Sequence, residues 1–485
     1  MESMKSLKQG GIYYLIYNVL NVFFPFLTGI YVSHVLLPET IGRVNAAQNL
    51  AQYFVILAFL GIPTYGLREL SRARNDEEEK NRIYSELYVI NFISTFVFSC
   101  IYLGVIFIVP QYRLDLTLYL VVGILIVLNA FNISWLYDGL EEFRFISIRN
   151  LIFKAISFAF LIVFVRDEKD FLLYALVNVI GTAGNYIINM ICSPRFVRFS
   201  FKNLNLKRHM RSIFFLVAVN LAIELYSLVD ITMMNFICKK DEIAFYKYGQ
   251  TIERILLQVI NTFTMVLVPR ISLYYKEGKF DGFNRLLSKA LKLILIFSIP
   301  MIIGIFFTSD LLLVKLYGAP YIASAQILKI LSCLILISPV GYLLGSRVML
   351  ATGNESRMII PVGIGAVVNI AGNTFMIPLF SGNGAAMASV FSEIVVMIVY
   401  VSMGKKYFKL ENDYKTLLKE AISILAITGF LFGVSFLRIN DWALLTIQIL
   451  GSVLIYLGLL LMLREEISME YFKAFMAKLK HQKMG

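Results

Sequence analysis

The chain has 485 residues, of which 58% are hydrophobic and only 16% are charged, and its mean hydropathy is +0.73. A water-soluble protein of this size does not carry so much apolar surface, so the composition excludes a soluble globular domain. The formal net charge of +13 does not indicate a nucleic-acid partner, because the basic residues lie between apolar runs and not along one face.

Apolar runs of about 20 residues recur along the chain, and each is long enough to cross about 30 Å of hydrocarbon as a helix. The strands of a membrane barrel would instead give short alternating segments. The sequence therefore predicts an all-α integral membrane protein with about fourteen transmembrane helices. They are expected at residues 11–37, 45–66, 83–109, 116–137, 148–165, 171–192, 212–237, 243–268, 286–307, 321–350, 358–380, 385–403, 417–437 and 442–463.

The opening hairpin consists of the first two runs, joined by a short link at residues 38–42 and followed by a charged loop at 67–82. A similar pattern recurs about 200 positions later, at residues 230–252, where Ile243 falls on Ile41 and Gln250 on Gln48. This repeat predicts two pseudo-symmetric six-helix lobes, residues 1–205 and 206–404. Residues 405–485 would add two helices and a basic tail.

Every second link between the predicted helices is rich in lysine and arginine, by about three or four to one over the other links. This asymmetry places the basic links and both termini in the cytoplasm. A miscounted pair of helices would not change the predicted location of the termini, because any even number of spans keeps both termini on the same side. No link is long enough for a folded domain outside the membrane.

Ionisable and amide side chains inside the predicted spans are candidate functional groups, because burying them in a bilayer is costly. The cations would line a water-filled central cavity that attracts an anionic substrate, and two carboxylates would couple to an ion or pair with a cation. The candidate cations are Lys154, Lys247, Arg254, Lys329 and Arg347, the carboxylates are Glu224 and Asp230, and the polar cavity residues are Asn18, Asn21 and Asn132.

Structural roles are the alternative for each of these groups. Lys154 and Arg347 lie near predicted span ends, where a long side chain can reach the interface. The asparagines can join helices through hydrogen bonds. Asp230–Lys247 and Glu224–Arg254 can be purely structural ion pairs. His209, in a basic cytoplasmic segment, is interpreted as an ordinary surface residue.

The sequence contains no nucleotide-binding glycine pattern and no HExxH motif, and its four cysteines show no metal-ligand spacing. We therefore expect no catalytic residues, no bound metal and no cofactor.

Three stretches resemble the bacterial polysaccharide repeat-unit flippases, the Wzx-type proteins of the polysaccharide transport branch of the multidrug/oligosaccharidyl-lipid/polysaccharide (MOP) exporters. The first is YVSHVLLPETIGRVNAAQNL, with its Leu-x-Pro-x-x-Ile-Gly link. The second is LYGAPYIASAQILKILS followed by GSRVMLATGNESR, and the third is IPLFSGNGAAMASVFSE. Arg43 occupies the family's position in the Ile-Gly-Arg link.

The resemblance implies that the chain moves undecaprenyl-diphosphate-linked oligosaccharide across the cytoplasmic membrane by alternating access. The sugar and the diphosphate would occupy the cationic cavity, and the lipid tail would stay in the bilayer. The family is thought to use an ion gradient, with H⁺ or Na⁺ as the candidate ion. The polymerase and the export machinery of the same polysaccharide pathway (O-antigen or capsule) are further candidate partners.

Three other functions remain open on the sequence. A lipid II flippase of peptidoglycan synthesis also has fourteen helices. A cation-coupled drug antiporter of the same superfamily normally stops at twelve helices. A membrane polysaccharide polymerase, from another class, normally needs a large outer loop with catalytic groups.

Overall fold

The computed structural model describes residues 21, 23–202, 204–265, 267–410, 414–470 and 472–473, without the side chains at 215, 218–227, 263, 265 and 268. These residues form helices and connecting turns, and no strand occurs among them. Ten of the described helical segments are long and apolar enough to cross a membrane, and Phe23–Ser33 and Leu228–Ile237 are shorter apolar helices. The predicted all-α integral membrane fold is confirmed, while the count of fourteen stays a prediction.

The chain folds into two compact units, unit 1 at Met1–Ala244 and unit 2 at Phe245–Gly485. The predicted division at residues 205 and 404 and the internal repeat stay predictions.

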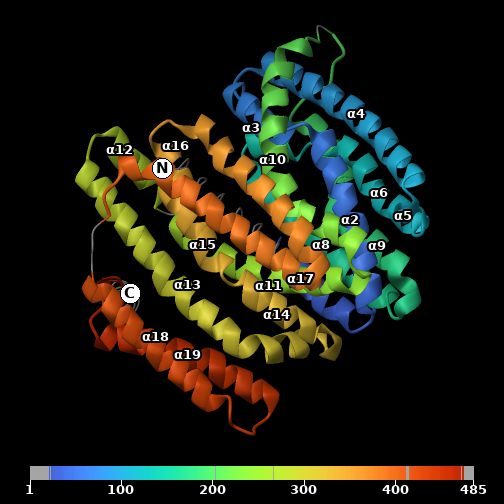
Figure 1. Cartoon of the computed structure of the whole chain (residues 1–485). Coiled ribbons are helices and arrows are strands. Elements are labelled where there is room, and N and C mark those ends of the chain that lie inside the picture. Colours follow the sequence, from blue (N-terminus) through green and yellow to red (C-terminus); the bar gives the residue numbers. More distant parts are fainter. Residues whose placement is uncertain are drawn as a thin grey trace, which may run out of the picture. The chain divides into compact units, whose positions relative to one another are not determined.

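Unit 1 is built on α2, which packs against α4, α6 and α10, while α8 packs on α9 and α9 on α6 (Figure 1). A core around the fully buried Trp135 joins α3, α4, α7 and the start of α10 through residues such as Leu70, Tyr84, Leu87 and Ile213. The helices of unit 1 are α2 Pro38–Phe59, α3 Ile62–Arg72, α4 Glu77–Ile108, α5 Pro110–Arg113, α6 Leu116–Leu128, α7 Ser134–Gly139, α8 Phe143–Phe164, α9 Phe171–Cys192 and α10 Lys207–Ile237.

Unit 2 is built around the long helix α13, which contacts α12, α14, α15, α18 and α19, while α17 packs on α14 and α15. The last two helices, α18 and α19, pack against each other and α13 (Figure 1). The helices are α11 Lys240–Met265, which begins in unit 1, and α12 Val268–Lys276, α13 Phe280–Tyr317, α14 Ala323–Leu331, α15 Leu334–Gly341, α16 Val348–Ala351, α17 Ile359–Gly404, α18 Tyr414–Val434 and α19 Asp441–Met462.

The opening hairpin turns earlier than the sequence predicts. The first apolar helix ends at Ser33, and α2 begins at Pro38, so residues 38–42 form the first turn of α2 and not a link. Proline suits this place, because the first helical residue has no intrahelical acceptor for an N–H. Gly42 then lies against the next hairpin, since a Cβ there would sit 1.6 Å from the carbonyl oxygen of Lys240. The glycine of the Leu-x-Pro-x-x-Ile-Gly link thus permits a close backbone contact between α2 and the start of α11.

Residues with left-handed backbone break the helices at two places, one inside a predicted span and one between two predicted spans. The run at residues 45–66 breaks at Leu60 (φ 50°) and Gly61 (φ 69°), and α3 begins with Ile62 and Pro63. Within α17, Ser381 (φ 50°, ψ −127°) separates two helical halves, close to the predicted boundary between the eleventh and twelfth spans. Gly384 lies beside this break, where a Cβ would come within 2.1 Å of the carbonyl oxygen of Met376. The small residues of the third motif therefore permit tight backbone packing.

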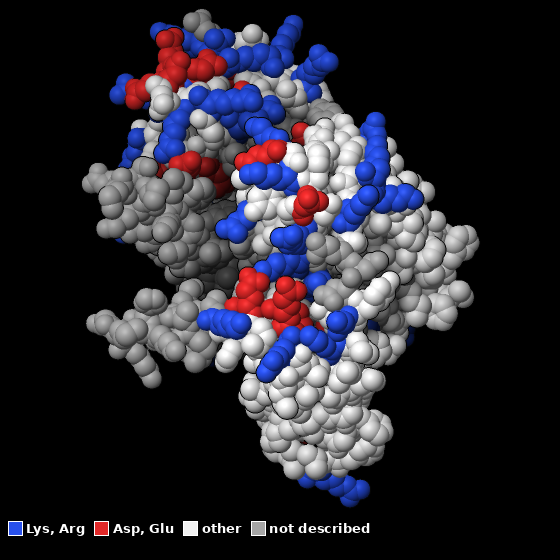
Figure 2. Space-filling model, turned by 90° about the vertical axis from the view of Figure 1, so that its left-hand side faces the viewer, with Lys and Arg blue, Asp and Glu red and all other residues white. Residues whose placement is uncertain are grey.

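Large apolar side chains are exposed along the spans, such as Phe96 (66%), Leu425 (71%) and Leu454 (72%). Figure 2 shows one face of the molecule, on which charged residues gather in groups and wide areas carry none. Exposed apolar helix surface is what contact with lipid tails requires. The chain is therefore a multi-pass membrane protein, while the side on which its termini lie stays a prediction.

Candidate functional site

A polar cavity surrounds Lys154 in unit 1. Lys154 is half-buried and is the twelfth of the 22 residues of α8, so it lies well away from both helix ends. The cavity, of about 100 Å³, lies between the helix at Phe23–Ser33, α8 and α9. Hydroxyl and amide groups from Thr28, Ser157, Asn178 and Thr182 line it together with Lys154, and none of its described lining residues is acidic.

The cavity carries unused hydrogen-bonding capacity. The hydroxyl oxygen of Ser157 is buried and has no hydrogen-bond partner among the described residues. Asn178 uses its amide nitrogen on the carbonyl of Tyr174 (3.2 Å), one turn earlier in α9. A cation next to hydroxyl and amide groups suits an anionic or polyhydroxylated ligand.

In unit 2, α11 carries Lys247, Glu253 and Arg254. Lys247 and Arg254 are seven residues apart and so lie nearly on one face of the helix, with Lys247 half-buried and Arg254 exposed. Glu253 points to another side and is only 3% exposed. It makes no hydrogen bond or ion pair with the described residues, although Arg254 and Glu393 lie near enough to act on its charge. The sequence analysis did not select Glu253, because only the fold shows how completely this side chain is buried.

Asp230 belongs to unit 1, where it is 3% exposed on α10. Close by, α2 and α10 are joined by polar contacts. The Asn49 amide donates to Thr232 Oγ1 (2.8 Å), which lies 3.0 Å from the hydroxyl of Tyr53. Asp230 lies within electrostatic range of Tyr53. Its candidate coupling role stays a prediction, as does its pairing with Lys247.

The remaining two candidate cations have local partners. Lys329 Nζ lies 2.6 Å from Asp310 Oδ2, which makes an ion pair between α14 and α13. Arg347 ends a π-helical turn, Tyr342–Arg347, and its guanidinium lies 4.4 Å from the centre of the Tyr342 ring. Such single π-helical turns are frequent at functional sites. Within their unit, these two cations and those of α11 are not joined in any described contact.

The amide candidates differ in what the structure says of them. Asn132 is buried, and its side-chain oxygen accepts from the N–H of Ser134 (3.3 Å), so it supports the start of α7. Asn21 is helical and half-buried. Asn18 and the side chain of Glu224 lie outside the described residues. For all these residues, a place in a transport cavity stays a prediction.

Sequence reasoning missed a buried charged network at one end of unit 1. The Glu86 carboxylate on α4 is fully buried and accepts hydrogen bonds from the N–H of Asn205 (2.6 Å), from Arg208 (2.7 Å to Nε) and from Arg82 (3.2 Å). His209 Nε2 lies 2.7 Å from the same carboxylate, and its Nδ1 lies 2.8 Å from the hydroxyl of Tyr65.

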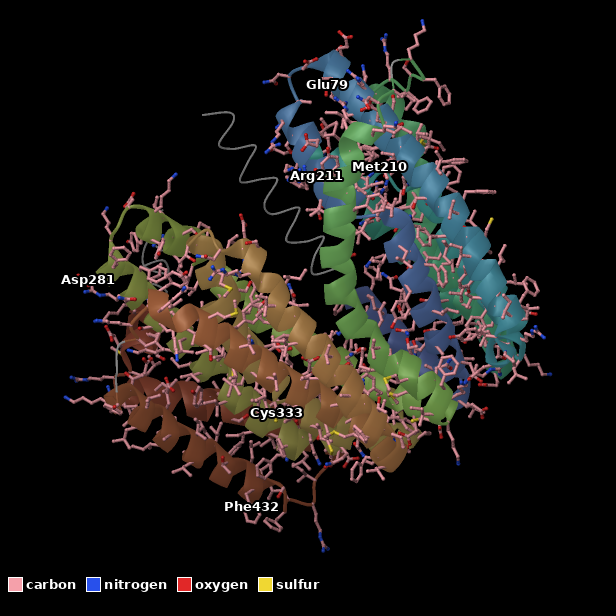
Figure 3. The ribbon with its side chains drawn as sticks, turned by 45° about the horizontal axis from the view of Figure 1, so that its top comes forward. Glu79, Met210, Arg211, Asp281, Cys333 and Phe432 are labelled. Carbon is pink, nitrogen blue, oxygen red and sulfur yellow. The ribbon has the colours of Figure 1, made fainter. Side chains whose placement is uncertain are left out.

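Figure 3 shows this end of unit 1 with its side chains, with Glu79 labelled at the start of α4 and Met210 and Arg211 labelled below it on α10. Glu79 adds a second ion pair to Arg208 (2.7 Å). The interpretation of His209 as an ordinary surface residue is wrong, since it is 2% exposed. Burial lowers the pKa of His209, against the opposing effect of Glu86. The spacing of residues 86 and 209 carries no sequence signal, because only the fold brings these helices together.

At the other end of unit 1, Arg43 joins three connecting segments. Its guanidinium pairs with Asp115 through Nε (2.9 Å) and Nη2, and lies 5.0 Å from the centre of the Phe171 ring. Glu168 accepts from the N–H of Leu37 (2.6 Å) and from the hydroxyl of Thr40. The family-like position of Arg43 thus holds the first hairpin to the links before α6 and α9.

No cluster of three or more metal-ligating side chains occurs in the described part of the chain. The described residues thus form helices that are apolar enough to cross a membrane and that carry polar and cationic groups, an arrangement common in membrane transporters.

Comparisons with known proteins agree with this class. The model of the family described as "Polysaccharide biosynthesis protein" matches residues 7–274, more than half of the chain, and the MatE family model matches residues 216–375. The chain belongs to the polysaccharide biosynthesis protein family. The resemblance inferred from the three sequence stretches is confirmed, and the family is one of transporters and not of enzymes.

Individual relatives are distant. The chain is 22% identical over 416 residues to an Escherichia coli K12 protein named "Putative O-antigen transporter", covering 82% of this chain and 98% of the relative. It is 23% identical over 242 residues to the lipid II flippase MurJ of Bacillus subtilis, covering 47% of this chain and 43% of that protein.

Solved structures share the fold. A lipid II flippase MurJ in an inward closed conformation matches with a TM-score of 0.72 at 18% identity, over 95% of this chain and 99% of that one. An inward-facing multidrug resistance MATE transporter of the MOP superfamily matches with a TM-score of 0.59 at 15% identity, over 81% and 97%.

Proposed function

We propose that this protein is a flippase that moves undecaprenyl-diphosphate-linked oligosaccharide repeat units from the cytoplasmic to the outer face of a bacterial cytoplasmic membrane. Transport occurs by alternating access and draws on an ion gradient. Membership in the polysaccharide biosynthesis protein family supports the substrate class.

The observation that carries the proposal is the cavity around Lys154. A lysine midway along a membrane helix is costly unless its surroundings are polar, and here hydroxyl and amide groups provide them. One positive charge attracts a diphosphate, and neighbouring hydroxyl and amide groups can exchange hydrogen bonds with sugar hydroxyls. The lipid tail needs no cavity, because it stays in the bilayer.

In unit 2, Lys247 and Arg254 on α11 provide further positive charge that can attract a diphosphate. Their shared helix face presents two cations at membrane depth, which favours a doubly charged headgroup over a neutral one. Lys329 and Arg347 remain weaker candidates, because each already has a local partner.

Coupling needs a group that changes charge or binds a cation during the cycle. Asp230 and Glu224 are the candidates from the sequence, with H⁺ or Na⁺ as the ion. Glu253 joins them, since its carboxyl group is 3% exposed and lacks a described ion pair. Asp230→Asn and Glu253→Gln are therefore expected to weaken the dependence of transport on the gradient.

The test replaces Lys154 in cells that need the protein to make surface polymer. Lys154→Ala should lower polymer output at least about tenfold, because the cavity loses its charge, and Lys154→Arg should retain part of it. Lys169→Ala, an exposed lysine in a link of the same unit, is the matched control and should leave output unchanged. Full output from Lys154→Ala, at equal amounts of protein in the membrane, would remove the cavity from the substrate path.

A lipid II flippase is the second candidate, favoured by the close fold similarity to MurJ. Loss of the protein distinguishes the two functions. Loss of a lipid II flippase would stop peptidoglycan synthesis and leave other surface polymers intact. Altered drug tolerance with normal lipid intermediates would indicate an antiporter. Single repeat units accumulating on the outer face would indicate a polymerase, for which the described structure offers no large outer domain.

A further inference from the structure

A second cavity, of about 180 Å³, lies in unit 2 at the ends of two neighbouring spans. One candidate span ends at Ala351, and the next runs from Glu355 to Tyr407. The cavity is bounded by the turn between these spans and by the final residues of the second span. In Figure 1, α16 and the later end of α17 lie at the same end of unit 2. The cavity thus lies at the ends of helical segments that are long and apolar enough to cross a membrane.

Asn354 fixes the shape of this cavity. Its side-chain nitrogen lies 3.1 Å from the carbonyl oxygen of Thr352 and 3.1 Å from the hydroxyl of Tyr407, and its N–H donates to the carbonyl of Met349 (2.8 Å). Gly353 supplies the positive φ (72°) that the turn requires. The turn and the end of the second span are therefore held together without a ligand.

Two cations line the cavity, Arg357 and Lys406, and both are exposed. Neither makes an ion pair with the described residues, and Lys406 Nζ instead lies 4.8 Å from the centre of the Tyr407 ring. The described lining residues include no Asp or Glu. Two cations without an ion pair among the described residues, beside the hydroxyls of Ser402 and Tyr407, suit a phosphate group.

The rest of the cavity wall is apolar. Met349 and Met403 line it; Met349 belongs to a buried cluster with Val396 and Tyr400, and the partly buried Met403 packs against this cluster. A phosphate joined to an apolar body fits such a site better than a free inorganic ion does. Basic pockets between transmembrane helices are a known kind of binding site for anionic lipid headgroups.

We propose that this cavity, formed by Arg357, Lys406, Ser402 and the turn at Asn354, binds the phosphate of an anionic phospholipid headgroup. Arg357 provides a planar pair of donors and Lys406 a point charge, so both engage one phosphate. The lipid stays in its leaflet, and only its headgroup enters the cavity. The site is separate from the polar cavity around Lys154 and does not rest on the proposed transport activity.

The test titrates dioleoyl-phosphatidylglycerol into the purified full chain in neutral detergent and follows thermal unfolding. Wild type should be stabilised by the anionic lipid and not by dioleoyl-phosphatidylcholine at equal amounts. The Arg357→Gln/Lys406→Gln variant should need roughly ten- to thirtyfold more phosphatidylglycerol for half of the effect. If the variant is less stable than wild type even without added lipid, native mass spectrometry tests the loss of binding directly. It counts the phosphatidylglycerol molecules bound to each protein.

The matched control is Lys405→Gln/Lys409→Gln, which removes two exposed lysines from the same segment but outside the cavity lining. It should titrate as wild type does. An equal weakening in both double variants would mean a diffuse basic surface and overturn the site. Equal stabilisation by millimolar inorganic phosphate would mean a free-anion site and overturn the lipid assignment. Unchanged titration of Arg357→Gln/Lys406→Gln would overturn the proposal altogether.

Discussion

Glu86→Gln is the sharpest test of the energetics of unit 1. The substitution keeps the size of the side chain and an acceptor for the N–H of Asn205, but it removes a buried charge that faces Arg82, Arg208 and His209. Breaking a fully buried ion pair costs about 3–5 kcal/mol. Since Arg82 and Arg208 are 38% and 29% exposed, water compensates part of this loss. We expect about 2 kcal/mol of destabilisation.

For a unit of this size, that cost lowers the midpoint of thermal unfolding by roughly 4–8 °C. The assay is the loss of monodisperse protein on heating in detergent, followed by size-exclusion chromatography. Glu141→Gln is the control, because its pair with Arg74 is about half exposed on both sides and is worth less than about 1 kcal/mol.

In an Arg208→Gln background, Glu86→Gln should cost clearly less than alone, because the two groups interact. Equal midpoints for Glu86→Gln and Glu141→Gln would refute the reasoning that the buried network stabilises this junction.

Two further predictions concern the same unit. Gly42→Ala should sharply lower the amount of folded protein, because its Cβ would collide with the carbonyl oxygen of Lys240, whereas Gly104→Ala, with open space around it, should express as wild type does. Stability should fall as the pH drops below about 6.5, because burial lowers the pKa of His209 and the unfolded chain then takes up the proton first. In His209→Gln the free energy of unfolding should depend less steeply on pH between 7.5 and 5.5, because this residue no longer titrates. An unchanged slope of stability against pH would contradict the role of its burial.

The helical membrane class follows directly from the apolar runs, because a bilayer admits no other arrangement for so many of them. Helix boundaries were less predictable. Pro38 was interpreted as part of a link, although it is well suited to the first turn of a helix, and the break at Leu60 depends on left-handed backbone that no residue type there demands.

The candidate site was predictable only in part. Lys154 stands out in the sequence because a cation inside an apolar run is rare, and the fold places it in a polar cavity. Glu86 lies at the start of a predicted span and His209 in a charged segment 123 positions later, and nothing in the pattern pairs the two residues. Such long-range partnerships depend on how α4 and α10 pack, and composition does not encode that packing.

The most direct test of the central claim is deletion of the protein followed by extraction and side-specific labelling of membrane lipids. The account predicts that complete undecaprenyl-diphosphate-linked repeat units accumulate on the cytoplasmic face while surface polymer disappears. Normal lipid intermediates with normal surface polymer, or accumulation of repeat units on the outer face, would contradict it.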